Sequence, residues 1–99
     1  KDKKALIEKS SKLISSLTNK PGNLVMVKLE TSCNMFFDQQ HGNCCLVEVK
    51  SIGSLKPSSM SKTLSEFLSL ELEIPIEKIY INFEDIEASM WAWKGSTFG

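Results

Sequence analysis

The sequence predicts an α+β fold built from strand–helix–strand units. A helical pattern followed by a proline turn and an apolar strand occurs twice, at residues 21–27 and 75–81. In the second copy another strand precedes the helix, whereas the first copy opens directly with its helix. Parallel pairing within each unit and right-handed crossovers give a four-stranded mixed sheet with both helices on one face. If the halves are structural duplicates, the first strand of this sheet belongs upstream of Lys1.

The first helix is predicted over residues 3–17. Asp2 is a suitable N-cap, and Pro21 disfavours helical geometry at Lys20, which therefore lies in a turn. One face of this helix carries apolar residues at helical spacing: Leu6, Ile7, Leu13, Ile14 and Leu17.

An apolar strand is predicted over Leu24–Glu30. Its nearly continuous apolarity is typical of a strand that is covered on both faces or paired centrally. Residues 31–42 are polar apart from Met35-Phe36-Phe37, which predicts a loop or short extended segment with an apolar lip.

The second unit begins with a strand over residues 44–51, in which apolar and polar side chains alternate up to the break at Gly53. The second helix starts at Pro57 and ends before Ile74-Pro75. Its apolar face consists of Met60, Leu64, Phe67, Leu68 and Leu72.

The last long strand is predicted over residues 79–83. The acidic residues that follow it, Glu84, Asp85 and Glu87, are expected in a solvated turn. The tail over residues 88–98 is rich in aromatic side chains, and we expect it to pack against another surface.

The bulk composition predicts a single domain over residues 1–99 and excludes some partners. The 12 Lys and Arg residues balance the 12 Asp and Glu residues, and no run of like charges is present. We therefore expect neither nucleic acid nor an anionic membrane as a partner. The longest apolar runs are about four or five residues, far below the ~20 that span a bilayer. We expect a cytoplasmic location, or secretion without a signal peptide.

The three cysteines are expected to be reduced. Cys44 and Cys45 are adjacent in a predicted strand, where their side chains point to opposite faces. His41 lies near them, but no metal-binding spacing is present, so we expect neither a metal nor a cofactor.

A sheet with helices on one face leaves its other face bare. The same surface of identical subunits is the simplest second layer, so the sequence predicts a homo-oligomer.

Six tracts along almost the whole chain resemble the macrophage migration inhibitory factor (MIF) family of the tautomerase superfamily. Each tract is short, and the resemblance comes from their order and separation. The tracts are Asn19-Lys20-Pro21, Leu24–Leu29, Met35-x-Phe37, Val47–Gly53, Ile79–Phe83 and Trp93-x-Gly95-Ser96-Thr97-Phe98.

The resemblance implies a homotrimer of β-α-β-β-α-β subunits that tautomerises phenylpyruvate-like α-keto acids or their enols. The catalytic base of such enzymes is an N-terminal proline, whose depressed pKa leaves it neutral near pH 7. No residue of this chain matches that proline, since Lys1 aligns about a dozen residues into the family pattern, beyond the length of a strand.

Several residues match the family's ligand site. Lys20 matches the lysine that faces the substrate carboxylate or enolate, and Ile52 matches the isoleucine that lines the pocket. Asn82 and Tyr80 match residues that reach the site from a neighbouring subunit. The pocket wall is expected to include Met35, Trp93 and Phe98.

Other interpretations of these residues stay open. Without the resemblance, Lys20 is an ordinary solvated lysine and Ile52 a core residue. Asn82 lies in an apolar strand, where a buried amide needs hydrogen-bond partners, so structural pairing and ligand contact are equally expected. After Met35-x-Phe37 the family usually has a Gly-Gly or Gly-Ser turn, whereas this chain has Asp38-Gln39-Gln40-His41, which predicts a more polar loop rim.

Two functions from different classes fit the sequence. The first is an isomerase whose proline precedes Lys1, and the second is a catalytically silent trimeric binding or signalling module of the same fold. A third expectation concerns the fragment itself, because an unpaired edge beside Leu24–Leu29 would promote strand exchange or aggregation.

Overall fold

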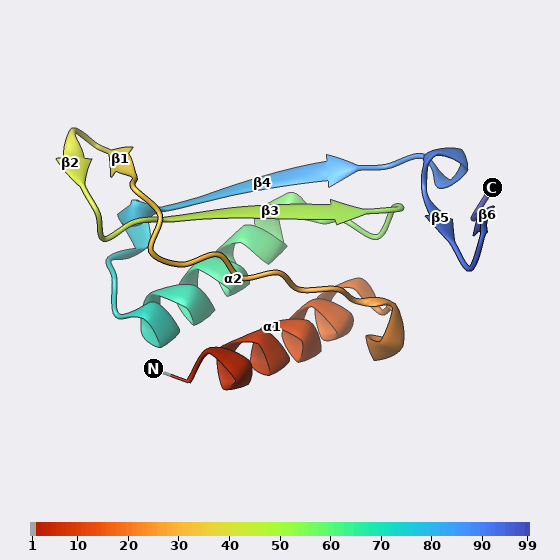
Figure 1. Ribbon diagram of the computed structural model, residues 1–99, viewed down its shortest axis with the longest axis horizontal. Coiled ribbons are helices and arrows are strands. Elements are labelled where there is room, and N and C mark those ends of the chain that lie inside the picture. Colours follow the sequence, from red (N-terminus) through yellow and green to blue (C-terminus); the bar gives the residue numbers. More distant parts are fainter. Residues whose placement is uncertain (1) are drawn as a thin grey trace. The chain divides into compact units, whose positions relative to one another are not determined.

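The computed structural model describes residues 2–99 (Figure 1). The chain divides into a unit that ends at Cys44 and a second unit, Cys45–Gly99. Two α-helices and several short and long strands form these units, so the predicted α+β class is confirmed. None of the helices in residues 2–99 is long and apolar enough to cross a membrane.

The first unit opens with α1, Lys3–Thr18, as predicted. The Asp2 carboxylate accepts a hydrogen bond from the Ala5 N–H at 3.0 Å and caps the helix. Asn19 ends it in the left-handed conformation, with φ at 57°. The buried Thr18 hydroxyl donates to the Ile14 carbonyl at 2.7 Å, which satisfies it inside the last turn.

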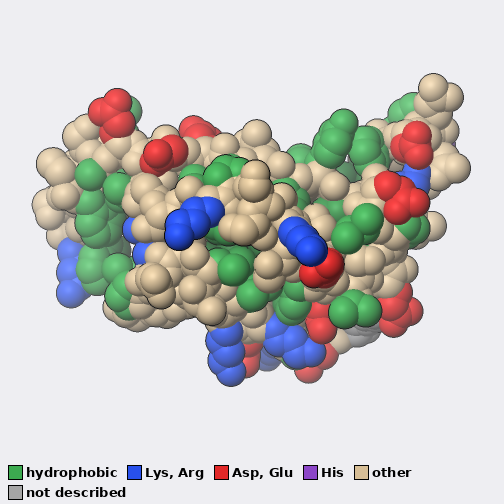
Figure 2. Space-filling view, turned by 180° about the vertical axis from the view of Figure 1, so that it is seen from behind, with side chains coloured by type: hydrophobic (Ala, Val, Ile, Leu, Met, Phe, Trp, Pro, Cys, Tyr) green, Lys and Arg blue, Asp and Glu red, His purple; other side chains and the backbone are tan. Residues whose placement is uncertain are grey.

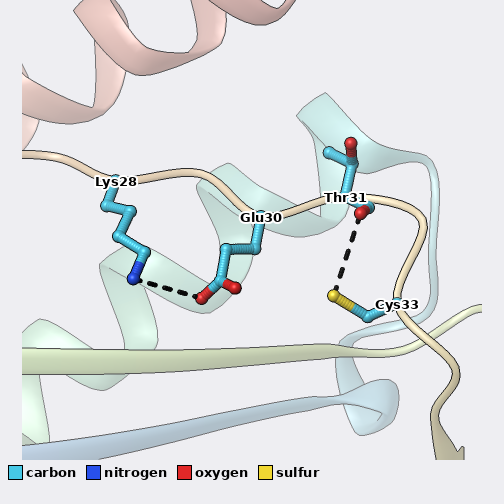
Figure 3. Close-up of polar contacts among 4 residues, drawn as sticks. All are labelled: Lys28, Glu30, Thr31 and Cys33. Carbon is cyan, nitrogen blue, oxygen red and sulfur yellow. Dashed lines mark hydrogen bonds and ion pairs between the residues drawn. The ribbon is translucent and has the colours of Figure 1, made fainter.

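The strand predicted over Leu24–Glu30 is not paired. The short helix η1, Gly22–Leu24, occupies its start, and residues 25–30 lack any ladder partner among the described residues. Their side chains still alternate between half-buried and exposed, which is the period of a strand. Lys28 and Glu30 share the exposed side, where Lys28 Nζ lies 3.6 Å from Glu30 Oε1 (Figure 3). The prediction was wrong because β-propensity selects an extended backbone but does not supply a partner.

A small hairpin follows, with β1 at Phe36–Phe37 and β2 at Gln40–His41. The two residues between the strands, Asp38 and Gln39, both have positive φ, at 54° and 57°. This is the backbone that a two-residue type I′ turn requires, and that glycine adopts most readily. The short extended segment predicted around Met35-Phe36-Phe37 is therefore confirmed.

The second unit is built on a parallel strand pair with a helical crossover (Figure 1). β3, Cys45–Ser51, pairs with β4, Ile79–Asp85, in a register that runs from Cys45↔Ile79 to Ser51↔Asp85. α2, Pro57–Leu72, connects them and packs on β4. The buried apolar side chains are Val49, Met60, Leu64, Leu68 and Ile79. This strand–helix–strand unit agrees with the prediction.

The tail folds back on itself after β4. The short helices η2, Ile76–Lys78, and η3, Ala88–Met90, flank β4, and η3 leads into a hairpin of β5, Ala92–Trp93, and β6, Ser96–Thr97. The tail was expected to pack against another surface. Its large apolar side chains are exposed in the single chain: Met90, Trp91, Trp93 and Phe98.

Candidate functional site

The carboxyl end of the β3–β4 pair carries the best-defined turn of the second unit. Ile52 follows β3 directly and is half-buried. On one side of it the Ser51 hydroxyl donates to the Gly53 carbonyl at 2.7 Å, and the Ser51 carbonyl accepts from the Ile86 N–H at 2.8 Å. These bonds tie the turn both to itself and to the end of β4.

Asp85 supplies the third bond of this turn. Its Oδ1 accepts from the Gly53 N–H at 2.9 Å, from 32 residues away in the sequence. The sequence predicted a solvated turn for Asp85; the residue is exposed, but it is the last residue of β4, because the strand pairing continues to Ser51↔Asp85. The local sequence does not reveal this bond, because it depends on the register of β3 and β4. The pairing of Ser51 with Asp85 brings the carboxylate beside Gly53.

The backbone of the turn is left-handed at two consecutive positions. Gly53 has φ at +67° and Ser54 at 61°. No atom lies within 4 Å of a Cβ built on Gly53, so the conformation, and not a lack of space, favours glycine there.

Tyr80 and Asn82 occupy the exposed face of β4. They pair in register with Leu46 and Glu48 of β3, which are also exposed. The buried amide considered for Asn82 is therefore wrong for the single chain. At ~3.3 Å per residue, Asn82 lies roughly 13 Å along the sheet from the level of Ile52. One chain does not bring these two residues into one site.

Lys20 lies in the turn after α1, as predicted. Its carbonyl accepts a hydrogen bond from the Ser15 hydroxyl at 2.6 Å, so the backbone is tied to the last turn of the helix. The left-handed Asn19 before it and Pro21 after it fix the direction in which the chain leaves the helix.

Met35 lines a cavity of about 500 Å³ in the first unit. The Gly42 N–H donates to the Met35 carbonyl at 3.0 Å and extends the β1–β2 hairpin by one pair. The Phe36 and His41 rings lie 4.8 Å apart on this hairpin. The other residues that line the cavity are Cys33, Asn34, His41 and Gly42.

Trp93 and Phe98 are brought together by the β5–β6 hairpin. Their ring centroids are 6.4 Å apart and their planes differ by 14°, which is a stacked arrangement. Lys94 Nζ lies 4.6 Å from the centroid of the Trp93 ring, within the range of a cation–π contact. The Phe98 N–H donates a hydrogen bond to the Trp91 carbonyl at 3.0 Å and joins the end of the tail to its start.

The electrostatic character of the surface is mixed. Lysine and carboxylate side chains both lie on the face drawn in Figure 2. In residues 2–99 no group of three or more His, Cys, Asp or Glu side chains is placed to hold a metal ion. Cys33, Cys44 and Cys45 are free thiols, and the Cys33 thiol donates to the Thr31 carbonyl at 3.8 Å (Figure 3).

Comparison with protein-family models matches residues 2–99 to the family described as "Macrophage migration inhibitory factor (MIF)". The chain belongs to the MIF family. The predicted resemblance is thereby confirmed over the whole described chain.

Curated MIF relatives are similar in sequence. The Brugia malayi MIF homolog is 36% identical over 98 residues, which cover 96% of this chain and 85% of that protein. The Xenopus tropicalis MIF is 30% identical over 96 residues, which cover 94% of this chain and 84% of that protein.

Solved MIF structures are similar in fold. The MIF homologue from Prochlorococcus marinus is 38% identical and superposes with a TM-score of 0.90, over 97% of this chain and 87% of that chain. The Trichinella spiralis MIF is 28% identical with a TM-score of 0.88, over 93% and 84% of the two chains. The MIF-like α+β fold is therefore established for this chain.

Proposed function

We propose that this chain is the body of a MIF-like tautomerase that interconverts the keto and enol forms of phenylpyruvate-like α-keto acids. The observation that supports it is the family match over residues 2–99. The resemblance read from the sequence assigns Lys20, Ile52 and Asn82 to the ligand site. The base would be a proline upstream of Lys1.

The proposed chemistry consists of a proton transfer by the N-terminal proline and the binding of the substrate by residues of this chain. A neutral secondary amine removes a proton from the carbon beside the keto group, and the keto oxygen gains a proton to become the enol hydroxyl. The Lys20 ammonium would hold the substrate carboxylate as a point charge. The Ile52 turn would border the ligand, and Trp93 with Phe98 would contact its aromatic ring.

The proposed assembly is a homotrimer, in which Tyr80 and Asn82 of one subunit reach the site of a neighbour. Two features support it. Tyr80 and Asn82 lie on an exposed sheet face, and Asn82 is too far along β4 to serve the Ile52 turn of its own chain.

A tautomerase assay tests the proposal. The 99-residue chain would be compared with a form extended at its N-terminus by a strand-length segment that begins with proline, and phenylpyruvate ketonisation would be followed by ultraviolet absorbance. We expect activity only in the extended form, and loss of that activity when its first proline becomes glycine.

Lys20→Ala in the extended form should raise KM for phenylpyruvate by about tenfold while kcat changes less, because a charge contact to the carboxylate is lost in ground and transition state alike. Lys12→Ala, on the exposed side of α1, is the matched control. A folded, trimeric, extended form without activity would support the silent binding module instead.

A further inference from the structure

The Asp85 side chain of β4 reaches the turn on which Ile52 lies. Strands β3 and β4 end at the same level, because Ser51 pairs with Asp85. From there the Asp85 carboxylate accepts from the Gly53 N–H at 2.9 Å. The neighbouring Glu84 pairs in register with Lys50, on the alternate side of the strand, and makes no such bond.

The backbone conformation of this turn requires stabilisation by groups outside it. Gly53 and Ser54 are both left-handed, and a serine in that conformation is disfavoured by its Cβ. The Ser51 hydroxyl fixes the Gly53 carbonyl at 2.7 Å, and Asp85 fixes the Gly53 N–H, so the peptide groups on both sides of Gly53 are held. A bond from a carboxylate to a backbone N–H is charge-assisted and stronger than one between neutral groups.

We propose that Asp85 is a positioning residue that fixes the Ile52 turn against an α-keto acid or enol ligand. The inference rests on the proposed function, which places the ligand at Ile52. Asp85 does not touch the ligand, and its carboxylate occupies the Gly53 N–H, so the ligand meets the turn at Ile52 and not at Gly53. An ordered turn binds more tightly than a mobile one, since less freedom is lost on binding.

The test uses the 99-residue chain and three variants. Asp85→Ala removes the acceptor, Asp85→Asn keeps a neutral acceptor in the same place, and Glu84→Ala is the matched control on the next residue. The amide hydrogen-exchange rate of Gly53, measured by NMR, reports how strongly its N–H is protected. The amide chemical shifts of Ile52 and its neighbours, followed as phenylpyruvate is added, report the affinity for this ligand.

In Asp85→Ala we expect Gly53 to exchange at least about tenfold faster and phenylpyruvate to bind about tenfold more weakly. Asp85→Asn should keep both within about threefold of the starting chain, and Glu84→Ala should change neither. Exchange at Val49 in the core should stay constant in all three variants, which separates a local effect from global unfolding.

Unchanged Gly53 exchange and unchanged affinity in Asp85→Ala would overturn the inference. Faster exchange with unchanged affinity would also overturn it, since the turn would then be held without serving the ligand. If phenylpyruvate shifts no amide near Ile52 in the unmodified chain, the proposed function is the part that fails, and the Gly53 exchange shows separately whether Asp85 holds the turn.

Discussion

Asp2 sets the start of α1 through one hydrogen bond, from the Ala5 N–H at 3.0 Å. Asp2→Ala should lower the free energy of unfolding by about 1 kcal/mol, because an N-terminal N–H of the helix loses its partner. Urea unfolding followed by circular dichroism measures this loss. Asp2→Asn is the control and should cost only a few tenths of that amount, since asparagine caps about equally well. An equal loss in both variants would contradict the capping role.

Met60 is the most deeply buried side chain, with 2% of its surface exposed. Met60→Ala should lower the free energy of unfolding by about 2–5 kcal/mol, through lost burial and the cavity left behind. Met60→Leu conserves volume and should cost less than about 1.5 kcal/mol, although it removes the sulfur that lies 3.2 Å from the Lys56 N–H. Chemical denaturation measures the free energy of unfolding of both variants. A similar loss in both would contradict the packing role of Met60.

At the scale of single residues, the sequence located the Asp2 cap and the buried face of α2 but not the bond made by Asp85. An N-cap acts on the N–H two or three positions further along the chain, so it can be predicted from the local sequence. The bond from Gly53 to Asp85 spans 32 residues and depends on the register of β3 and β4, which no local pattern encodes.

The segment over residues 25–30 has the side-chain alternation of a β-strand, but it does not pair with another strand among residues 2–99. Its amide hydrogens should exchange with solvent far faster than those of β3, because main-chain partners protect only the latter. Hydrogen–deuterium exchange with peptide-level mass spectrometry measures both segments in one experiment. Val47 and Val49 of β3 are the internal reference. Equal protection would show that residues 25–30 pair with another strand in solution.

Helices were predicted more successfully than strands in this chain. Each helix contains its own hydrogen bonds, so a local apolar period and a start signal such as Pro57 suffice to define it. A strand is completed only by another strand. β3 and β4 have each other, whereas residues 25–30 have the right alternation and no partner within residues 2–99.

For the whole molecule, the exposed β3–β4 face is the proposed trimer surface. Leu46 and Tyr80 pair in register on it and are 55% and 62% exposed. Leu46→Glu should shift the mass in solution from three chains of 11.1 kDa toward one, because a charge cannot be buried there unpaired. Multi-angle light scattering measures the mass directly.

Leu70→Glu is the control for this prediction. Leu70 lies on α2, is 79% exposed, and undergoes the same change of side chain. It should leave the mass unchanged. A trimer that persists in Leu46→Glu, or one lost equally in both variants, would place the assembly on another surface.

The parallel register of β3 and β4 has a consequence for how the chain folds. Every rung joins residues 34 apart, as in Cys45↔Ile79 and Ser51↔Asp85, so no tight reversal can nucleate the ladder. Closing a loop of this length costs about 3 kcal/mol in chain entropy before the first rung forms. α2 supplies 16 of the 27 residues between β3 and β4, so its formation shortens the flexible chain that has to close. We therefore expect the folding rate of the second unit to depend on how readily α2 forms, although the product is a strand pair.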